Sequence, residues 1–94
     1  MLVAFICHDK PNHVDLRMKT RPTHLAWLEQ YVAKITYAGP LLADDGQTLR
    51  GSLIIGDFES LEAARAFQKA DPYTEAGLFA EVTCIPTRKV FPAA

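Results

Sequence analysis

The order of short apolar runs and helical repeats along the chain limits its fold more than any other feature of the sequence. The first run, Leu2 to His8, is too short for a helix and ends at polar residues and a proline, so it predicts a largely buried strand. Pro22 fits the first turn of a helix, and apolar side chains then recur at steps of three and four residues. This spacing predicts a helix from about Arg21 to Ala33, after a polar connection that reaches about Thr20.

The second half of the chain predicts a hairpin, another helix and a final strand. Two strand-like stretches, Ile35 to Ala43 and Ser52 to Phe58, flank a segment of turn-forming residues. Ser60 offers an N-cap for a helix from Leu61 to Ala70, whose apolar residues recur at helical spacing. A β-rich segment from Val82 to Val90 closes the chain.

This β-α-β-β-α-β order predicts an α+β fold of the ferredoxin-like type, with both helices on one face of a four-stranded antiparallel sheet. We expect residues 1–94 to form one domain, with nothing left over to cover the other face of the sheet. Alternation places Leu53, Ile55 and Asp57 on one side of the third strand and Ser52, Ile54 and Gly56 on the other. Because neither side is wholly polar, we expect a homodimer that packs sheet to sheet. A monomer with a half-wetted sheet is the alternative, since antiparallel sheets tolerate one.

The composition argues against several classes of protein. Hydrophobic residues make up 49% of the chain and charged residues 22%, and the net charge is -1, which favours neither disorder nor binding to nucleic acid. No apolar stretch approaches the roughly 18 residues of a membrane span, and Met1 leads directly into a strand, so we expect a cytoplasmic protein without a membrane partner. Two cysteines, Cys7 and Cys84, are too few for a disulfide framework and predict buried thiols.

One imidazole and one carboxylate are the strongest candidates for chemistry. We expect His24 in the first turn of its helix, where the positive end of the helix dipole disfavours the imidazolium and leaves the neutral ring that a general base needs. Asp71 precedes Pro72, whose ring ends the second helix, and it can cap a short helix from Tyr73 to Ala76. A capping aspartate retains lone pairs that can orient an imidazole. The alternatives are a packed histidine and a purely structural cap.

Other polar residues give weaker indications. His8, Asp9 and His13 cluster near the end of the first strand, but their spacing matches no metal motif, so we do not expect a metal site. Arg17 and Arg21 could clamp an anionic group of a substrate, although arginines in a polar connection are more often solvated.

A further set of motifs extends over nearly the whole chain: His8-Asp9-Lys10, Arg17, Arg21-Pro22-Thr23-His24-Leu25, Ala38-Gly39-Pro40, Gly51-Ser52, Phe58-Glu59-Ser60-Leu61-Glu62-Ala63-Ala64, Ala70-Asp71-Pro72-Tyr73 and Lys89-Val90-Phe91. Together they resemble the YCII-related (YciI-like) family. The resemblance implies a ferredoxin-like subunit in a dimeric α/β barrel, with His24 and Asp71 as the histidine and aspartate of its pocket. It also implies enzyme chemistry, because one branch of the family resembles dehydrochlorinases of chlorinated hydroxyquinols and the wider fold group includes muconolactone isomerases. The chain departs from the family at His8 and in its short hairpin from Asp44 to Arg50.

We therefore predict a small dimeric enzyme in which His24 takes or shuttles a proton while Asp71 fixes the tautomer of the imidazole and stabilises its charged form. The reaction would be an elimination or an isomerisation of a small metabolite, cyclic or derived from an aromatic compound, because both reactions need proton transfer and no cofactor. The residues expected to bind the substrate are Asp9, Arg17, Ser52 and Tyr73. The alternatives are a non-catalytic module that binds or senses a small ligand in the same pocket, and a structural protein whose dimer interface is its purpose.

Overall fold

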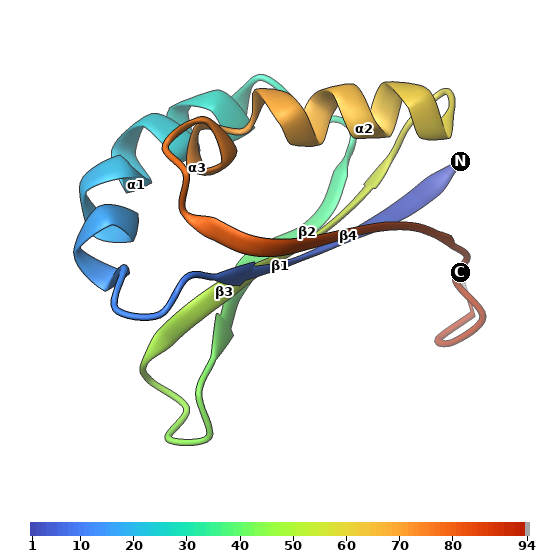
Figure 1. Ribbon diagram of the computed structural model, residues 1–94. Coiled ribbons are helices and arrows are strands. Elements are labelled where there is room, and N and C mark those ends of the chain that lie inside the picture. Colours follow the sequence, from blue (N-terminus) through green and yellow to red (C-terminus); the bar gives the residue numbers. More distant parts are fainter. Residues whose placement is uncertain (94) are drawn as a thin grey trace.

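A computed structural model describes residues 1–93, which form a four-stranded antiparallel sheet with three helices on one face (Figure 1). The elements in chain order are β1 (Leu2–Asp9), α1 (Val14–Glu29), β2 (Ile35–Leu42), β3 (Leu49–Asp57), α2 (Leu61–Ala70), α3 (Pro72–Glu75) and β4 (Phe79–Thr87). The strands lie in the order β2-β3-β1-β4, and each neighbouring pair is antiparallel. This is the predicted ferredoxin-like plan, with the short helix α3 inserted before the last strand.

The first helix differs from the prediction. It begins at Val14, well before Arg21, so Pro22 lies inside α1 rather than in its first turn. The prediction was wrong because the residues of α1 that are buried are Arg17 and His24, and polar residues on the inner face weaken the hydrophobic periodicity that marks a helix. His24 therefore lies in the second half of α1 and not in its first turn, so the predicted position beside the positive end of the helix dipole was wrong.

Two strands also begin earlier than the sequence predicts. The hairpin pairs Leu42 with Leu49, so β3 starts before Ser52. Gly77 follows α3 with a φ of 77°, a conformation that favours glycine, and this turn lets the chain pair Phe79 with Asp9 at once. The last strand consequently runs from Phe79 to Thr87 and not from Val82 to Val90.

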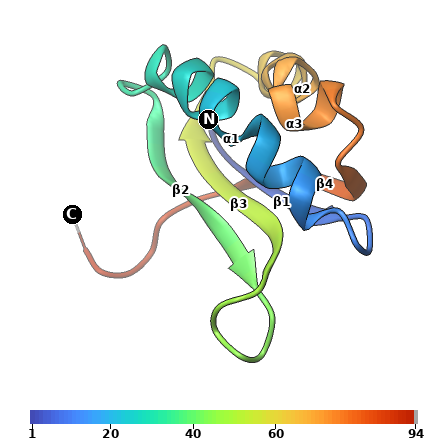
Figure 2. The same ribbon diagram turned by 90° about the vertical axis from the view of Figure 1, so that its left-hand side faces the viewer.

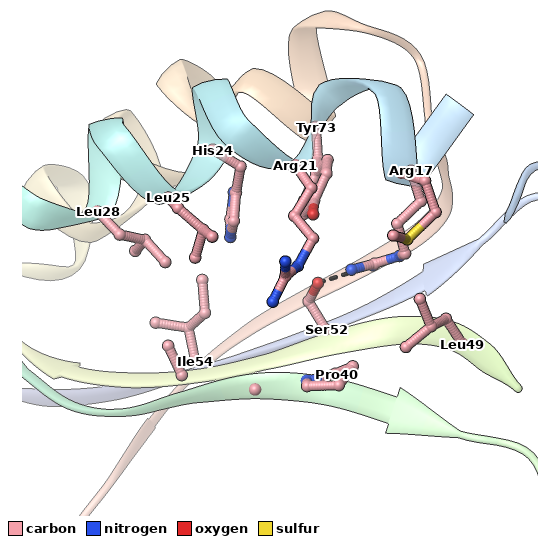
Figure 3. A pocket seen from close by; sticks show the side chains of 13 residues that line it. Arg17, Arg21, His24, Leu25, Leu28, Pro40, Leu49, Ser52, Ile54 and Tyr73 are labelled. Atoms are coloured by element: carbon pink, nitrogen blue, oxygen red, sulfur yellow. Dashed lines mark hydrogen bonds between the residues drawn. The ribbon is translucent and has the colours of Figure 1, made fainter. Parts of the chain in front are cut away.

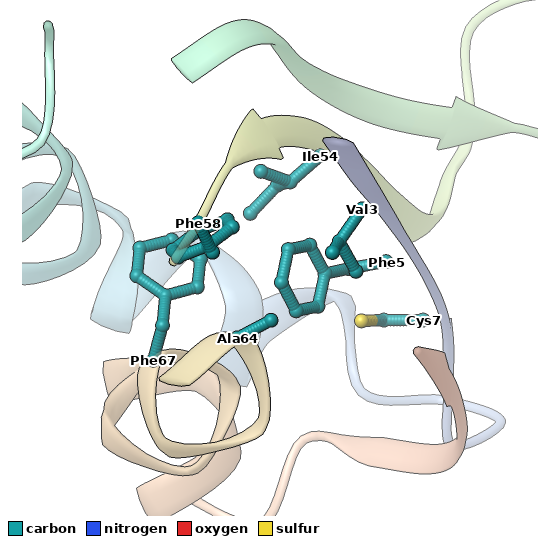
Figure 4. Close-up of a cluster of buried hydrophobic side chains, with 7 residues drawn as sticks. All are labelled: Val3, Phe5, Cys7, Ile54, Phe58, Ala64 and Phe67. Carbon is teal, nitrogen blue, oxygen red and sulfur yellow. The ribbon is translucent and has the colours of Figure 1, made fainter. Parts of the chain in front are cut away.

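The hydrophobic core lies between α2 and the inner face of the sheet (Figure 4). Phe67 of α2 is at its centre, with ring centroids 4.9 Å from Phe58 and 5.3 Å from Phe5. The thiol of Cys7 packs in the same cluster, and burial, assisted by the charge of Asp71, raises its pKa to about 12. Cys7 is thus the expected buried thiol, whereas Cys84 is only half-buried.

The opposite face of the sheet, which we call the outer face, is not covered by any element within residues 1–93 (Figure 2). The strand registers align four apolar side chains in one row across it: Tyr37, Ile55, Ala4 and Ile85. Tyr37 and Ile85 are each 49% exposed. The alternation predicted for β3 is present, since Ser52 and Ile54 are buried under the helices and Leu53 and Ile55 lie on the outer face. Within residues 1–93, none of the helices combines the length and the apolar character that a membrane span requires.

Candidate functional site

A cavity of about 390 Å³ lies between α1 and the inner face of the sheet (Figure 3). Its walls come from α1, from β2 and β3, and from Tyr73 of α3. The apolar part of the lining includes Leu25, Leu28, Pro40 and Ile54. A cavity of this size and lining, with a few polar groups converging on it, is typical of a site for a small organic molecule.

Three polar residues of α1 line this cavity. Arg17, Arg21 and His24 follow one another at steps of four and three residues, so they lie on one face of the helix. Arg17 and His24 are buried, whereas Arg21 is exposed. The continuous helix from Val14 is what brings these three side chains together.

The structure places His24 and Asp71 in direct contact. Nδ1 of His24 lies 2.9 Å from Oδ1 of Asp71, and the two residues are 6% and 2% exposed. Because a carboxylate can only accept, the hydrogen of the ring is on Nδ1, and in the neutral imidazole Nε2 has a free lone pair. The ring lines the cavity, as Figure 3 shows. The pair thus has the geometry of a general base with its orienting carboxylate.

Asp71 performs the predicted capping role at the same time. Its Oδ1 accepts a hydrogen bond of 2.9 Å from the backbone N–H of Tyr73, which starts α3. The same oxygen therefore fixes both the short helix and the imidazole. Since α3 carries Tyr73 into the lining of the cavity, the cap also positions a wall of the site.

Tyr73 packs against the two buried side chains of α1, Arg17 and His24. Its ring stacks on that of His24 with centroids 4.0 Å apart and an angle of 20°, and Cζ of Arg17 lies 4.5 Å from its centroid. Burial raises the pKa of the Tyr73 hydroxyl, despite the opposing charge of Arg17, so the phenol stays neutral at physiological pH. The stacked ring limits the rotation of His24 and holds its orientation toward the cavity.

A buried ion pair lies at the end of the cavity nearest the start of α1. Nε and Nη2 of Arg17 donate to the two carboxylate oxygens of Asp9 at 2.7 and 2.9 Å, and Nη2 also donates to Oγ of Ser52 at 2.8 Å. Burial alone would lower the pKa of Arg17, but the hydrogen bonds and charge of Asp9 outweigh it and the pKa is raised. The residue before Ser52 is a glycine, and a Cβ at Gly51 would collide with the carbonyl oxygen of Cys7, so the glycine lets β3 lie close to β1 here.

Three of the four residues predicted to bind the substrate line the cavity. Arg17, Ser52 and Tyr73 line the cavity, whereas Asp9 does not and reaches it only through Arg17. Asp9 instead lines a neighbouring cavity of about 380 Å³ together with His8 and His13. Within residues 1–93 no cluster of three His, Cys, Asp or Glu side chains could hold a metal ion.

Arg21 is the cavity residue whose position the sequence analysis missed. The expected helix start made Arg21 its first residue and left Arg17 in a connection, so their shared face was not evident. Their spacing of four residues, followed by His24 three residues later, was the available signal.

The fold and the site together define a ferredoxin-like α+β domain with a buried His-Asp pair beside a small-molecule cavity. The family model of the YCII-related domain matches residues 1–88, and the chain belongs to this family. It is 39% identical to the protein YciI of Escherichia coli O6:H1, over 97% of this chain and 100% of that protein. It is 38% identical, with the same coverage, to an uncharacterised protein of Haemophilus influenzae.

The chain is also similar to a solved structure over nearly its whole length. That structure is the 5-chloro-2-hydroxyhydroquinone dehydrochlorinase of Burkholderia phenoliruptrix in complex with 2,5-dihydroxybenzoquinone. The TM-score is 0.86 at 34% sequence identity, and the match covers 94% of each chain. The similarity supports both the fold and the expectation of a small ligand.

Asp9→Asn should destabilise the protein by about 3 to 5 kcal/mol, because it leaves the buried guanidinium of Arg17 without a counter-charge. Urea unfolding of the parent and the variant measures this change. Asp57→Asn is the control, because Asp57 pairs with the N-terminal amine at the surface and 72% of its side chain is exposed. Ion pairs that water and salt screen contribute little to the free energy of unfolding. Equal effects of the two substitutions would contradict the importance given to the buried pair.

Asp71→Asn should leave the tautomer of His24 unchanged. Both hydrogen bonds of Asp71 use Oδ1, and the N–H of Tyr73 holds an amide at this position with its oxygen toward the ring, so Nδ1 can still donate. The loss of stability should be small, because Asn caps a helix as well as Asp does. Long-range ¹H–¹⁵N correlation spectra of the imidazole at alkaline pH report the tautomer.

Asp71→Ala is the matched comparison, because it removes both hydrogen bonds of Oδ1. It should release the ring toward the tautomer with hydrogen on Nε2 and cost about 0.5 to 2 kcal/mol for the lost cap. An Asp71→Asn spectrum that already shows hydrogen on Nε2 would mean that the cap does not orient the amide.

Proposed function

We propose that the chain is a small enzyme that moves a proton on a small organic substrate, with His24 as the general base and Asp71 as the residue that orients it. The observation that supports this best is the buried contact of 2.9 Å between Nδ1 and Oδ1, which leaves Nε2 of a cavity-lining ring free to accept a proton. The similar dehydrochlorinase of Burkholderia phenoliruptrix, which acts on a chlorinated hydroxyhydroquinone, supports an enzyme of this kind.

The proposed mechanism begins with the ring neutral and its Nδ1–H donating to Asp71. Nε2 takes a proton from the bound substrate, and the carboxylate of Asp71 stabilises the imidazolium that forms. In an isomerisation the same Nε2–H returns the proton to another atom of the substrate. In an elimination the electron pair left behind expels the leaving group, and the proton passes to solvent. Neither course needs an electron acceptor or a metal.

The cavity favours a compact, largely unsaturated substrate. Leu28 and Ile54 provide apolar contact, while the polar groups of Ser52 and Tyr73 lie on other parts of the lining. We propose a cyclic or aromatic-derived metabolite, because a flat ring can bury its faces against the apolar walls while its substituents reach the polar side chains.

We further propose that the protein is a homodimer that packs through the outer face of the sheet. The row formed by Tyr37, Ile55, Ala4 and Ile85 is apolar and uncovered within the described residues. Burying it against the same row of a second chain would remove this surface from water through a symmetric contact.

His24→Asn should lower turnover of 5-chloro-2-hydroxyhydroquinone by about a hundredfold or more, because an amide cannot accept and return a proton. The amide N–H can still donate to Asp71, so the folded state should be retained. Chloride release measures turnover, and the melting temperature of the same preparation reports folding. His13→Asn is the control, since His13 lies outside the cavity and its Nδ1–H donates to the carbonyl of Pro11.

Full activity of a folded His24→Asn variant would contradict the role of His24 as base. A parent protein that binds 2,5-dihydroxybenzoquinone, the ligand of the similar dehydrochlorinase, but turns over neither this substrate nor related hydroxyquinols would favour the alternative of a binding or sensing module.

Sedimentation equilibrium should give a mass of about twice the 10.4 kDa of one chain. Ile55→Lys should shift the protein toward monomer, because it places a charge in the centre of the outer-face row. Val32→Lys is the control, since Val32 is 72% exposed in the connection between α1 and β2. A parent chain that remains monomeric at micromolar concentration would rule out this dimer.

A further inference from the structure

We infer that Arg21 and Ser52 form a binding site for an ionised oxygen of the substrate, a phenolate, enolate or carboxylate, beside the base His24. This inference rests on the proposed function and adds to it the charge of the group that the cavity selects. It also assigns different roles to the two arginines of α1, since Arg17 holds the site together and Arg21 meets the ligand.

Arg17 has few donors left for a ligand. Its guanidinium makes two hydrogen bonds to Asp9 and one to Ser52, its face lies over the ring of Tyr73, and it is 4% exposed. The charge of Asp9 balances its own. A ligand that bound Arg17 directly would have to break a buried ion pair, which is costly. Arg17 is therefore a positioning residue.

The hydroxyl of Ser52 is a donor directed by that arrangement. Its Oγ accepts from Nη2 of Arg17, and it is 4% exposed. No hydrogen bond donated by Ser52 to another residue is found within residues 1–93. A hydroxyl has one hydrogen to donate, and a buried polar hydrogen favours a partner. Because Ser52 lines the cavity, an oxygen atom of a ligand can supply that partner. The bond from the cationic Arg17 polarises the hydroxyl and makes it a better donor.

Arg21 supplies the charge that such an oxygen needs. Its side chain extends from α1 into the cavity, on the side where the Ser52 hydroxyl lies (Figure 3). Among residues 1–93 no carboxylate forms an ion pair with Arg21, in contrast to Arg17. Its guanidinium donors are therefore available, and a guanidinium pairs with planar oxyanions through two parallel hydrogen bonds.

The remainder of the lining agrees with this assignment. The described residues contribute two guanidinium groups and no carboxylate to the cavity, because Asp9 and Asp71 lie outside its lining. An anion held by Arg21 and Ser52 would lie in the same cavity as the imidazole of His24. Negative charge that grows on the held oxygen as His24 takes the proton would then be stabilised by donors already in place.

The test measures the binding of 2,5-dihydroxybenzoquinone, a vinylogous acid that is ionised at neutral pH, by titration calorimetry. Arg21→Met should weaken binding by about 10- to 100-fold, the range expected for hydrogen bonds to a charged group. Arg21→Lys should recover part of the loss, since it restores the positive charge without the planar guanidinium that makes two parallel hydrogen bonds. Lys19→Met is the matched control: it removes the same charge from the same helix outside the cavity and should leave affinity unchanged.

A neutral probe separates charge recognition from loss of packing. 2,5-Dimethoxybenzoquinone cannot ionise, and its affinity should be the same in the parent and in Arg21→Met. Ser52→Ala should weaken binding of the anion by several-fold and leave the neutral probe unaffected. Equal losses for the two probes, no loss in Arg21→Met, or a parent protein that does not prefer the anion would each overturn the inference.

These outcomes are separate from the test of His24. Binding that depends on Arg21 together with full activity of His24→Asn would overturn the proposed base and leave the oxyanion site standing. Loss of activity in His24→Asn, together with anion binding that is unchanged in Arg21→Met, would overturn the oxyanion site and leave the proposed base standing.

Discussion

The burial of a guanidinium under α1 is the constraint on which the site depends. Arg17 is inside the protein because Asp9 at the end of β1 supplies its counter-charge and Ser52 of β3 accepts a further hydrogen bond. An uncompensated charge at this depth would cost several kcal/mol, so helix, strands and partner residues must assemble together. The contact fixes the first turns of α1 over the sheet, and this placement gives Arg21 and His24 their common face.

The two long helices divide the inner face of the sheet into a core and a site. Phe67 of α2 packs against the rings of Phe5 in β1, Trp27 in α1 and Phe58 just after β3, and these residues form part of the hydrophobic core. The face of α1 toward the sheet instead carries charged and titratable groups, so it cannot pack as closely and a cavity remains. The aromatic core thus centres on α2, whereas the cavity lies under α1, although Trp27 of α1 also packs against the core.

A single carboxylate oxygen joins the backbone to the proposed chemistry. Oδ1 of Asp71 accepts from the N–H that begins α3 and from the imidazole of His24. The α3 turn then presents Tyr73, whose ring stacks on His24 and touches Arg17. A short cap motif, which would be unremarkable in most helices, here aligns three of the side chains that surround the cavity. Such shared supports are how small domains hold a site without large loops.

The sequence by itself determined the order of elements, the family and the two candidate catalytic residues. The order of elements follows from local signals, such as the cap sequence at Asp71 and the turn formers of the hairpin, which act over a few residues. The family follows from the resemblance of motifs along nearly the whole chain, which also strengthened the case for His24 and Asp71. Sequence reasoning failed at the start of α1, because the buried side of this helix is polar and Pro22 resembled a first-turn proline.

Only the tertiary structure decided what each polar residue does. It showed that the carboxylate of Asp9 is paired with Arg17 and that no described carboxylate pairs with Arg21. It also showed that Nδ1 of His24 is bonded to Asp71 and that the ring lies away from the first turn of its helix. These outcomes depend on burial and on partners that lie far apart in the chain, with 47 residues separating His24 from Asp71. Propensity and periodicity contain no information on such distances, because they describe neighbours along the chain and not neighbours in space.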